Sequence, residues 1–104
     1  MSLKAAFLFV APETNPKLHR SVVDTPVLRL DIVGVSNYAE AVQVAQELVE
    51  SGVTAIELCA GFGTEGAALV SQAVKGKAVV GVVRFDNHPG FGFKSGDELF
   101  AAKE

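Results

Sequence analysis

The stretch "AIELCAGFGTEG", residues 55–66, decides the fold. Its first half is an apolar run that holds one carboxylate, Glu57, and one thiol, Cys59. Its second half has the spacing G-x-G-x-x-G and leads into a segment with helical periodicity. A strand that passes through a glycine-rich turn into a helix is a unit of a parallel α/β sheet. The stretch therefore predicts such a sheet, and it poses the question whether the turn binds a nucleotide.

Length and composition exclude several classes of protein. The chain has 104 residues, which suits one domain, and its net charge of −3 comes without a basic patch, so we expect no nucleic-acid partner. No window approaches the ~20 apolar residues of a membrane span, so we expect no membrane partner. The single cysteine, Cys59, cannot build a disulfide framework, which favours a reducing, cytoplasmic location.

Apolar periodicity and capping signals place the expected elements along the chain. Asn15 followed by Pro16 favours a short helix, Ser36 or Asn37 caps a long one, and Ser95 with Glu98 forms a capping box. The expected strands cover residues 4–10, 27–35, 54–60 and 78–85, and the expected helices cover about 16–22, 37–52 and 64–75, with a short last helix after residue 95. The apolar stripes of the two long helices are Tyr38, Ala41, Val42, Ala45, Leu48 and Val49, and then Leu69, Val70, Ala73 and Val74.

These elements predict an α/β fold, with a small four-stranded, mainly parallel sheet built from βα units. Strands joined by helices lie parallel with right-handed crossovers, and strands adjacent in chain order place both long helices on one face. We expect a single domain over residues 1–104. Within it, the glycine-rich residues 87–104, with Phe91 and Phe93, would form a C-terminal arm or lid.

The second face of the sheet is the expected place for charged residues. Alternation along the strands allows one face to carry six polar side chains together, namely Arg29, Asp31, Glu57, Cys59, Arg84 and Asp86. Charges inside apolar strands are costly unless they are paired or hydrated. We therefore interpret this face as a site, a subunit contact, or both, and we expect a homo-oligomer.

The glycine motif has three interpretations. Its position between a strand and a helix, with Asp86 a little over 20 residues later, is typical of a dinucleotide fold. Against this, the chain is short for such a fold, and Glu65 places negative charge inside the turn. The turn thus binds a dinucleotide, binds another small anion, or serves only close packing; no cofactor is identified. The residues expected to contact an anion are Gly61, Phe62, Gly63, Thr64, Arg84 and Asp86.

Three residues are candidates for catalysis. Glu57, between two apolar neighbours, is either an acid/base with a perturbed pKa or the partner of Arg84 in a structural ion pair. Cys59 together with His88 would suit a thiolate nucleophile, or Cys59 is simply a small buried hydrophobic residue. The spacing of Glu57, Asp86 and His88 matches no ligand pattern, so no metal site is predicted.

Two families show a resemblance to this sequence. The run "AEAVQVAQELVESGVTAIEL", residues 39–58, resembles the helix–strand unit of (β/α)-barrel aldolases of the 2-keto-3-deoxy-6-phosphogluconate type. That resemblance implies a proton-transfer role for Glu57. Over most of its length the chain resembles a family of short bacterial proteins of unknown function, through "KAAFLFVAP", "HRSVVDTP", "AIELCAGFG", "GVVRFD" and "SGDELF". This second resemblance implies a small α/β fold and no particular activity.

The sequence thus favours a small cytoplasmic α/β protein that binds a small anionic molecule. Ligands of parallel α/β sheets bind beyond the carboxyl ends of the strands, where the glycine turn lies. Two alternatives stay open: a lyase- or isomerase-like enzyme with Glu57 as acid/base, and an oligomerisation or accessory module. Whether the protein is an enzyme is left undecided.

Overall fold

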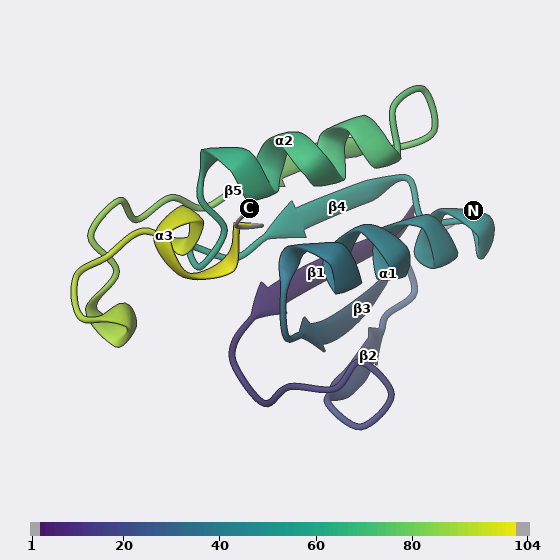
Figure 1. Ribbon diagram of the computed structural model, residues 1–104. Helices are drawn as coiled ribbons and strands as arrows, with labels where there is room; N and C mark the ends of the chain where they lie inside the picture. The colour runs from purple at the N-terminus through teal and green to yellow at the C-terminus, as the bar shows by residue number, and fades with distance from the viewer. Residues whose placement is uncertain (1–2, 102–104) are drawn as a thin grey trace.

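The fold is the expected α/β type, with five strands and three α-helices in the computed structural model, which describes residues 3–101 (Figure 1). The C-terminal arm was expected to extend to residue 104, so its last three residues lie outside the described range. In chain order the elements are β1 Leu3–Val10, β2 Arg20–Asp24, β3 Leu28–Val35, α1 Tyr38–Glu50, β4 Ala55–Leu58, α2 Thr64–Ala73, β5 Val79–Val82, the 3-10 turn η1 Pro89–Phe91 and α3 Gly96–Phe100. No helix within residues 3–101 has the length and apolar character needed to cross a bilayer.

The strand order of the sheet is β2-β3-β1-β4-β5. Strands β3, β1, β4 and β5 are parallel, as predicted, and β2 is antiparallel to β3. The expectation that the strands are adjacent in chain order is wrong, because β1 lies between β3 and β4. Helix α1 packs on both β1 and β3. Its 13 residues make it about 20 Å long. The helix therefore carries the chain from the end of β3 across β1 to the position of β4.

The expected helix at residues 16–22 is absent, and strand β2 takes part of its place. The Asn15 side chain accepts a hydrogen bond from the Lys17 N–H at 2.8 Å, so it closes a local turn rather than starting a helix. The residues that follow, Val22 and Val23, are β-branched and pair across to β3, where Val23 lies opposite Leu30.

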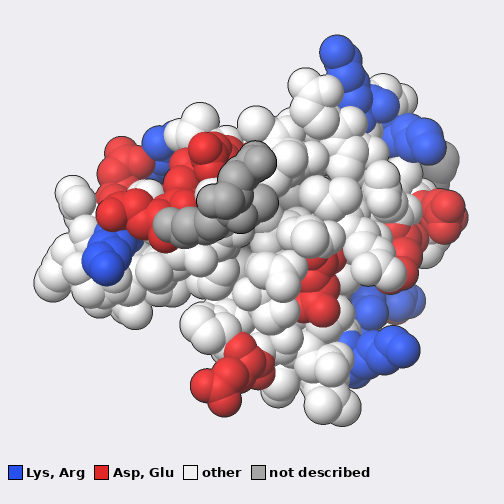
Figure 2. All heavy atoms as spheres, in the orientation of Figure 1, with Lys and Arg blue, Asp and Glu red and all other residues white. Residues whose placement is uncertain are grey.

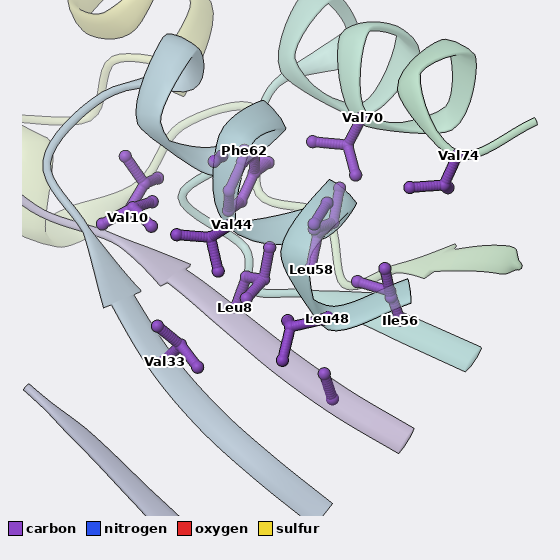
Figure 3. Close-up of a cluster of buried hydrophobic side chains, with 14 of the residues drawn as sticks. Leu8, Val10, Val33, Val44, Leu48, Ile56, Leu58, Phe62, Val70 and Val74 are labelled. Carbon is purple, nitrogen blue, oxygen red and sulfur yellow. The ribbon is translucent and has the colours of Figure 1, made fainter. Parts of the chain in front are cut away.

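Both long helices cover one face of the sheet, as predicted (Figure 1). Figure 3 shows their apolar side chains meeting those of the strands, among them Leu8, Leu58 and Val70. Asn37 caps α1 by accepting a hydrogen bond from the Glu40 N–H at 2.8 Å, which confirms the predicted start of this helix. The predicted stripes are largely buried, but Leu69 is 46% exposed because α2 turns that side away from the sheet.

The other face of the sheet has no helix on it among the described residues, and we call it the open face. Its side chains alternate with those of the core, since Ala6, Leu8 and Val10 point toward the helices. The open face is formed by Leu3, Ala5, Phe7 and Phe9 of β1, Ser21 and Val23 of β2, Leu28, Leu30, Ile32 and Gly34 of β3, Ala55 and Glu57 of β4 with Cys59 beyond it, and Val79 and Gly81 of β5 with Val83 beyond it.

The prediction that one face gathers the charged residues is wrong. Asp31 pairs in register with Ala6, whereas Glu57 pairs with Phe7, so these two carboxylates point to opposite faces of the sheet. On the helix-covered face, Asp31 is buried and forms salt bridges with Arg29 at 3.1 Å and Arg20 at 3.9 Å. The sequence pattern gave the correct alternation within each strand but not the register between strands.

Candidate functional site

The predicted glycine turn joins β4 to α2 and is folded tightly. The Phe62 N–H donates to the Cys59 carbonyl oxygen at 3.1 Å, and the Gly61 N–H donates to Cys59 Sγ at 3.2 Å. Phe62 is only 1% exposed and stacks on Tyr38, with 5.6 Å between ring centroids. The side chain of Phe62 is therefore part of the core, although its backbone belongs to the turn where a ligand was expected.

Each glycine of the motif is contacted by a side chain from another part of the fold, at a distance that leaves little or no room for a Cβ atom. A Cβ at Gly66 would lie 2.5 Å from Tyr38 Cζ, and a Cβ at Gly63 would overlap the carboxylate of Asp97. A Cβ at Gly61 would lie 3.0 Å from Val10 Cγ1. The G-x-G-x-x-G spacing is thus accounted for by the approach of Tyr38, Asp97 and Val10 to the turn.

The carboxylate of Asp97 occupies the amino-terminal end of α2. Its oxygens accept hydrogen bonds from the Glu65 N–H at 3.0 and 3.1 Å and from the Gly66 N–H at 3.4 Å. These amides have no partner inside the helix, and Gly63 at the cap position has no side chain to satisfy them. Asp97, brought from α3, supplies the missing acceptor and complements the positive end of the helix dipole.

Tyr38 connects this carboxylate to the turn. Its hydroxyl donates to Asp97 Oδ1 at 3.0 Å and accepts from the Gly63 N–H at 3.0 Å. Tyr38 is the first residue of α1, so the cluster brings together residues from α1, the glycine turn, α2 and α3. We call Tyr38, Asp97 and the amides of Gly63, Glu65 and Gly66 the anion cradle.

Burial raises the pKa of the Tyr38 hydroxyl well above its usual range. The hydrogen bond to Asp97 and the negative charges of Asp97 and Glu65 raise it further, while the Gly63 N–H acts in the opposite direction. The phenol is therefore a hydrogen-bond donor at physiological pH, and it is poorly suited to act as a base.

The raised pKa of Tyr38 predicts a loss of stability in alkali. The unfolded chain releases the tyrosine proton near pH 10, whereas the folded protein retains it. Above pH 10 the unfolding free energy should therefore fall by up to about 1.4 kcal/mol per pH unit from this residue. Urea denaturation at pH 9, 10 and 11 should show this fall in the wild type and a smaller one in Tyr38→Phe. The same pH dependence in both proteins would contradict the assignment.

Aromatic contacts fix the C-terminal segment, residues 83–101, against the cradle. His88 stacks on Phe91 with 4.1 Å between centroids, Phe91 meets Phe100 edge-on at 5.4 Å, and Phe100 packs against Tyr38 at 5.9 Å. The predicted capping box is confirmed: Glu98 Oε2 accepts from the Ser95 N–H at 2.9 Å. These contacts place α3, and with it Asp97, at the start of α2 (Figure 1).

The residues expected to act in catalysis do not meet. Glu57 and Cys59 lie on the open face, and neither shares a hydrogen bond or salt bridge with His88 among the described residues. The proposed Glu57–Arg84 ion pair is wrong, since Arg84 Nε instead contacts Asp86 Oδ1 at 2.8 Å in an exposed pair. His88 Nδ1 accepts from the Gly90 N–H at 3.0 Å and so shapes the η1 turn. Thr64 is exposed at the first position of α2.

An apolar hollow adjoins the cradle. It has a volume of about 450 Å³ and is lined by Asn37, Tyr38, Ala39, Val42, Leu69 and Phe100. Tyr38 and Phe100 thus belong to the hollow and also lie beside Asp97. This size is within the range of pockets that hold small organic ligands, which are mostly apolar with a few polar groups.

The surroundings of the cradle are acidic. In Figure 2, acidic side chains gather over α3 and the start of α2, whereas most lysine and arginine side chains in view lie toward the other end. Within residues 3–101, no three His, Cys, Asp or Glu side chains come together in a way that could hold a metal ion. A second anion beside the Asp97 carboxylate would therefore be repelled.

Sequence reasoning missed Asp97 and the hydroxyl of Tyr38. The sequence pattern assigns Tyr38 only to an apolar stripe, and it assigns no role to Asp97, which lies between the capping residues Ser95 and Glu98. The two are 59 positions apart, so no local pattern indicates their contact. The excess of glycine in residues 61–66 was the usable signal, because it marks a place where other groups approach the backbone.

Comparison with known proteins gives one match. A family model described as "Family of unknown function (DUF6506)" matches residues 3–98 of the chain. Neither the curated proteins nor the solved structures contain a match.

Proposed function

Since the chain belongs to this family of unknown function, we propose a function from the site itself: the protein binds a small organic carboxylate in the anion cradle. The ligand's carboxylate takes the position of Asp97, and its apolar part lies in the hollow beside Tyr38 and Phe100. The observation that carries this proposal is the convergence of the Tyr38 hydroxyl and the Glu65 and Gly66 amides on one carboxylate.

The cradle selects a carboxylate for physical reasons. Hydrogen bonds to a charged group are roughly twice as strong as neutral ones, and the helix dipole adds about 0.3–1 kcal/mol for an anion at this end. Three donors already point at the two oxygens of Asp97: helix α2 holds the two amides, and stacking on Phe62 holds the Tyr38 ring. A ligand carboxylate would find the same donors without reorganising them.

Asp97 competes with the ligand for the same hydrogen-bond donors, so the ligand must bind them with a higher affinity than Asp97 does. A group on the same chain competes at an effective concentration that is about millimolar for a short flexible tether, and higher for Asp97, because Phe100 and Phe91 hold α3 in place. A simple anion such as acetate would displace it poorly. A carboxylate on an apolar body gains about 25 cal/mol for each Å² of apolar surface that it buries, and the 450 Å³ hollow provides that surface. Asp97 would leave the cradle by rotation of its own side chain, so that Phe100 still lines the hollow.

The alternative enzymatic role for Glu57 requires a different site. Glu57 is exposed on the open face, on the opposite side of the sheet from α1 and the anion cradle. An acid/base reaction at Glu57 would therefore use neither Tyr38 nor the glycine turn. For this reason we place the binding function at the cradle.

Asp97→Ala tests the proposal. The variant should lose about 2 kcal/mol of unfolding free energy, since hydrogen bonds to a charged group contribute about 1.5–3 kcal/mol. Phenylacetate, used as the probe, should raise the unfolding temperature of Asp97→Ala more than that of the wild type, because the competing carboxylate is gone. Acetate at the same concentration should have a smaller effect.

The matched control is Asp24→Ala, which removes the same charge from the exposed end of β2. Phenylacetate should stabilise this variant no more than the wild type. The proposal fails if phenylacetate leaves Asp97→Ala unchanged relative to sodium chloride at equal ionic strength. It also fails if Asp24→Ala responds as strongly as Asp97→Ala.

A further inference from the structure

The open face is an apolar surface that the described chain leaves without a helix over it. Phe7 and Phe9 on the central strand are only partly buried, and so are Leu30 and Ile32 on β3. Toward the edge, Val79 is 71% exposed and Val83 is 49% exposed. Glu57 is the one charged side chain on this face among the described residues.

A mainly parallel sheet with one bare apolar face is incomplete. Sheets of parallel strands occur almost only where both faces are covered. Here α1 and α2 cover one face, and the chain contributes no helix to the other within residues 3–101. We propose that a second copy of this chain covers it, so that two sheets pack face to face with Phe7, Phe9, Leu30 and Ile32 in the shared core.

The dimensions of the open face suit a modest dimer. Five strands about 4.8 Å apart span about 24 Å, and a mean strand length near six residues gives about 19 Å. Each copy therefore offers a flat area of about 450 Å², without the extra surface of the protruding side chains. A pair of copies buries on the order of 1,000 Å² in total. That value is near the lower bound for a specific interface and indicates a reversible dimer.

The composition of the face favours a second copy over an unrelated partner. Homodimer interfaces are more apolar than other interfaces and are depleted of charge at their centre. The open face has no charge pattern that would select a nucleic acid or a charged peptide, since Glu57 stands alone. Two twisted sheets of the same shape also pack well, at about −30°.

The test compares lysine substitutions in β5 and at the residue after it, which point to the two opposite faces of the sheet. Val83→Lys and, separately, Val79→Lys place a charge on the open face, while Val82→Lys is the matched control. Val82 is 50% exposed, like Val83, but pairs with Leu58 and therefore points to the helix side. Dissociation constants would be measured for the full chain by sedimentation equilibrium, with circular dichroism to confirm folding.

We expect Val83→Lys and Val79→Lys to weaken dimerisation by about tenfold each, because each places a charge at the border of an apolar contact, and Val82→Lys to leave it within about threefold. Glu57→Leu should strengthen it by about tenfold, because it removes the one charge that dimerisation would desolvate; misfolding would not produce that gain. A wild type that stays monomeric at 500 µM, including one that binds a different protein through this face, would overturn the proposal. So would equal weakening by Val82→Lys.

Discussion

Phe62→Ala is expected to cost about 3–5 kcal/mol of unfolding free energy, the usual range for removing a buried aromatic side chain. Phe62 is 1% exposed and stacks on Tyr38, so its loss leaves a cavity beside the anion cradle. The expectation distinguishes two roles for this residue, since a phenylalanine that only contacted a ligand would affect affinity and leave stability nearly unchanged. Urea denaturation measures the difference.

Phe93→Ala provides the comparison for Phe62. Phe93 is 69% exposed in the C-terminal segment, and its removal should change stability by no more than about 0.5 kcal/mol. Similar losses in the two variants would show that Phe62 has no special place in the core. A loss below about 1 kcal/mol in Phe62→Ala would contradict the packing of the glycine turn described above.

Gly96→Ala is expected to release α3 from the start of α2. A Cβ at this position would collide with the backbone carbonyl oxygen of Gly61, which cannot rotate away as a side chain would. The overlap and the resulting loss of the Asp97 hydrogen bonds together should cost on the order of 3 kcal/mol. Hydrogen exchange at the amides of Glu65 and Gly66 should accelerate, because these amides lose their acceptor.

A double-mutant cycle tests whether Gly96 acts through Asp97. If Gly96→Ala already removes Asp97 from the cradle, the variant carrying both Gly96→Ala and Asp97→Ala should be little less stable than Gly96→Ala alone. Additive losses, within about 0.5 kcal/mol, would show that the two residues act independently. Unchanged amide exchange in Gly96→Ala would lead to the same conclusion.

Local signals in the sequence predicted local structure well. Asn37 caps α1, and Ser95 with Glu98 caps α3, because a cap depends on residues within a few positions of each other. The segment that became β2 was read as a helix, since Asn15 followed by Pro16 can begin either a turn or a helix. Only pairing with β3 decides between the two, and that pairing is not visible in the segment itself.

Longer-range features could not be inferred in the same way. The alternation of Leu28, Leu30 and Ile32 marks one face of β3 but does not reveal which face α1 covers. Because β1 lies between β3 and β4, Asp31 and Glu57 are not on neighbouring strands. Each pairs with a different residue of β1, so their side chains point to opposite faces, and the prediction that places them together is wrong. The contact between Tyr38 and Asp97 depends on where α3 docks, which a single sequence does not specify.

The central claim is that the amides at the start of α2 form a carboxylate site that Asp97 fills from within the chain. The most direct measurement is a titration of ¹⁵N-labelled Asp97→Ala with phenylacetate, followed by the amide resonances in NMR spectra. The account predicts saturable shifts that are largest at Gly63, Glu65 and Gly66, with weaker ones along the hollow at Val42 and Leu69. Shifts that fail to saturate, or that are spread evenly over the molecule and leave Glu65 and Gly66 unchanged, would contradict it.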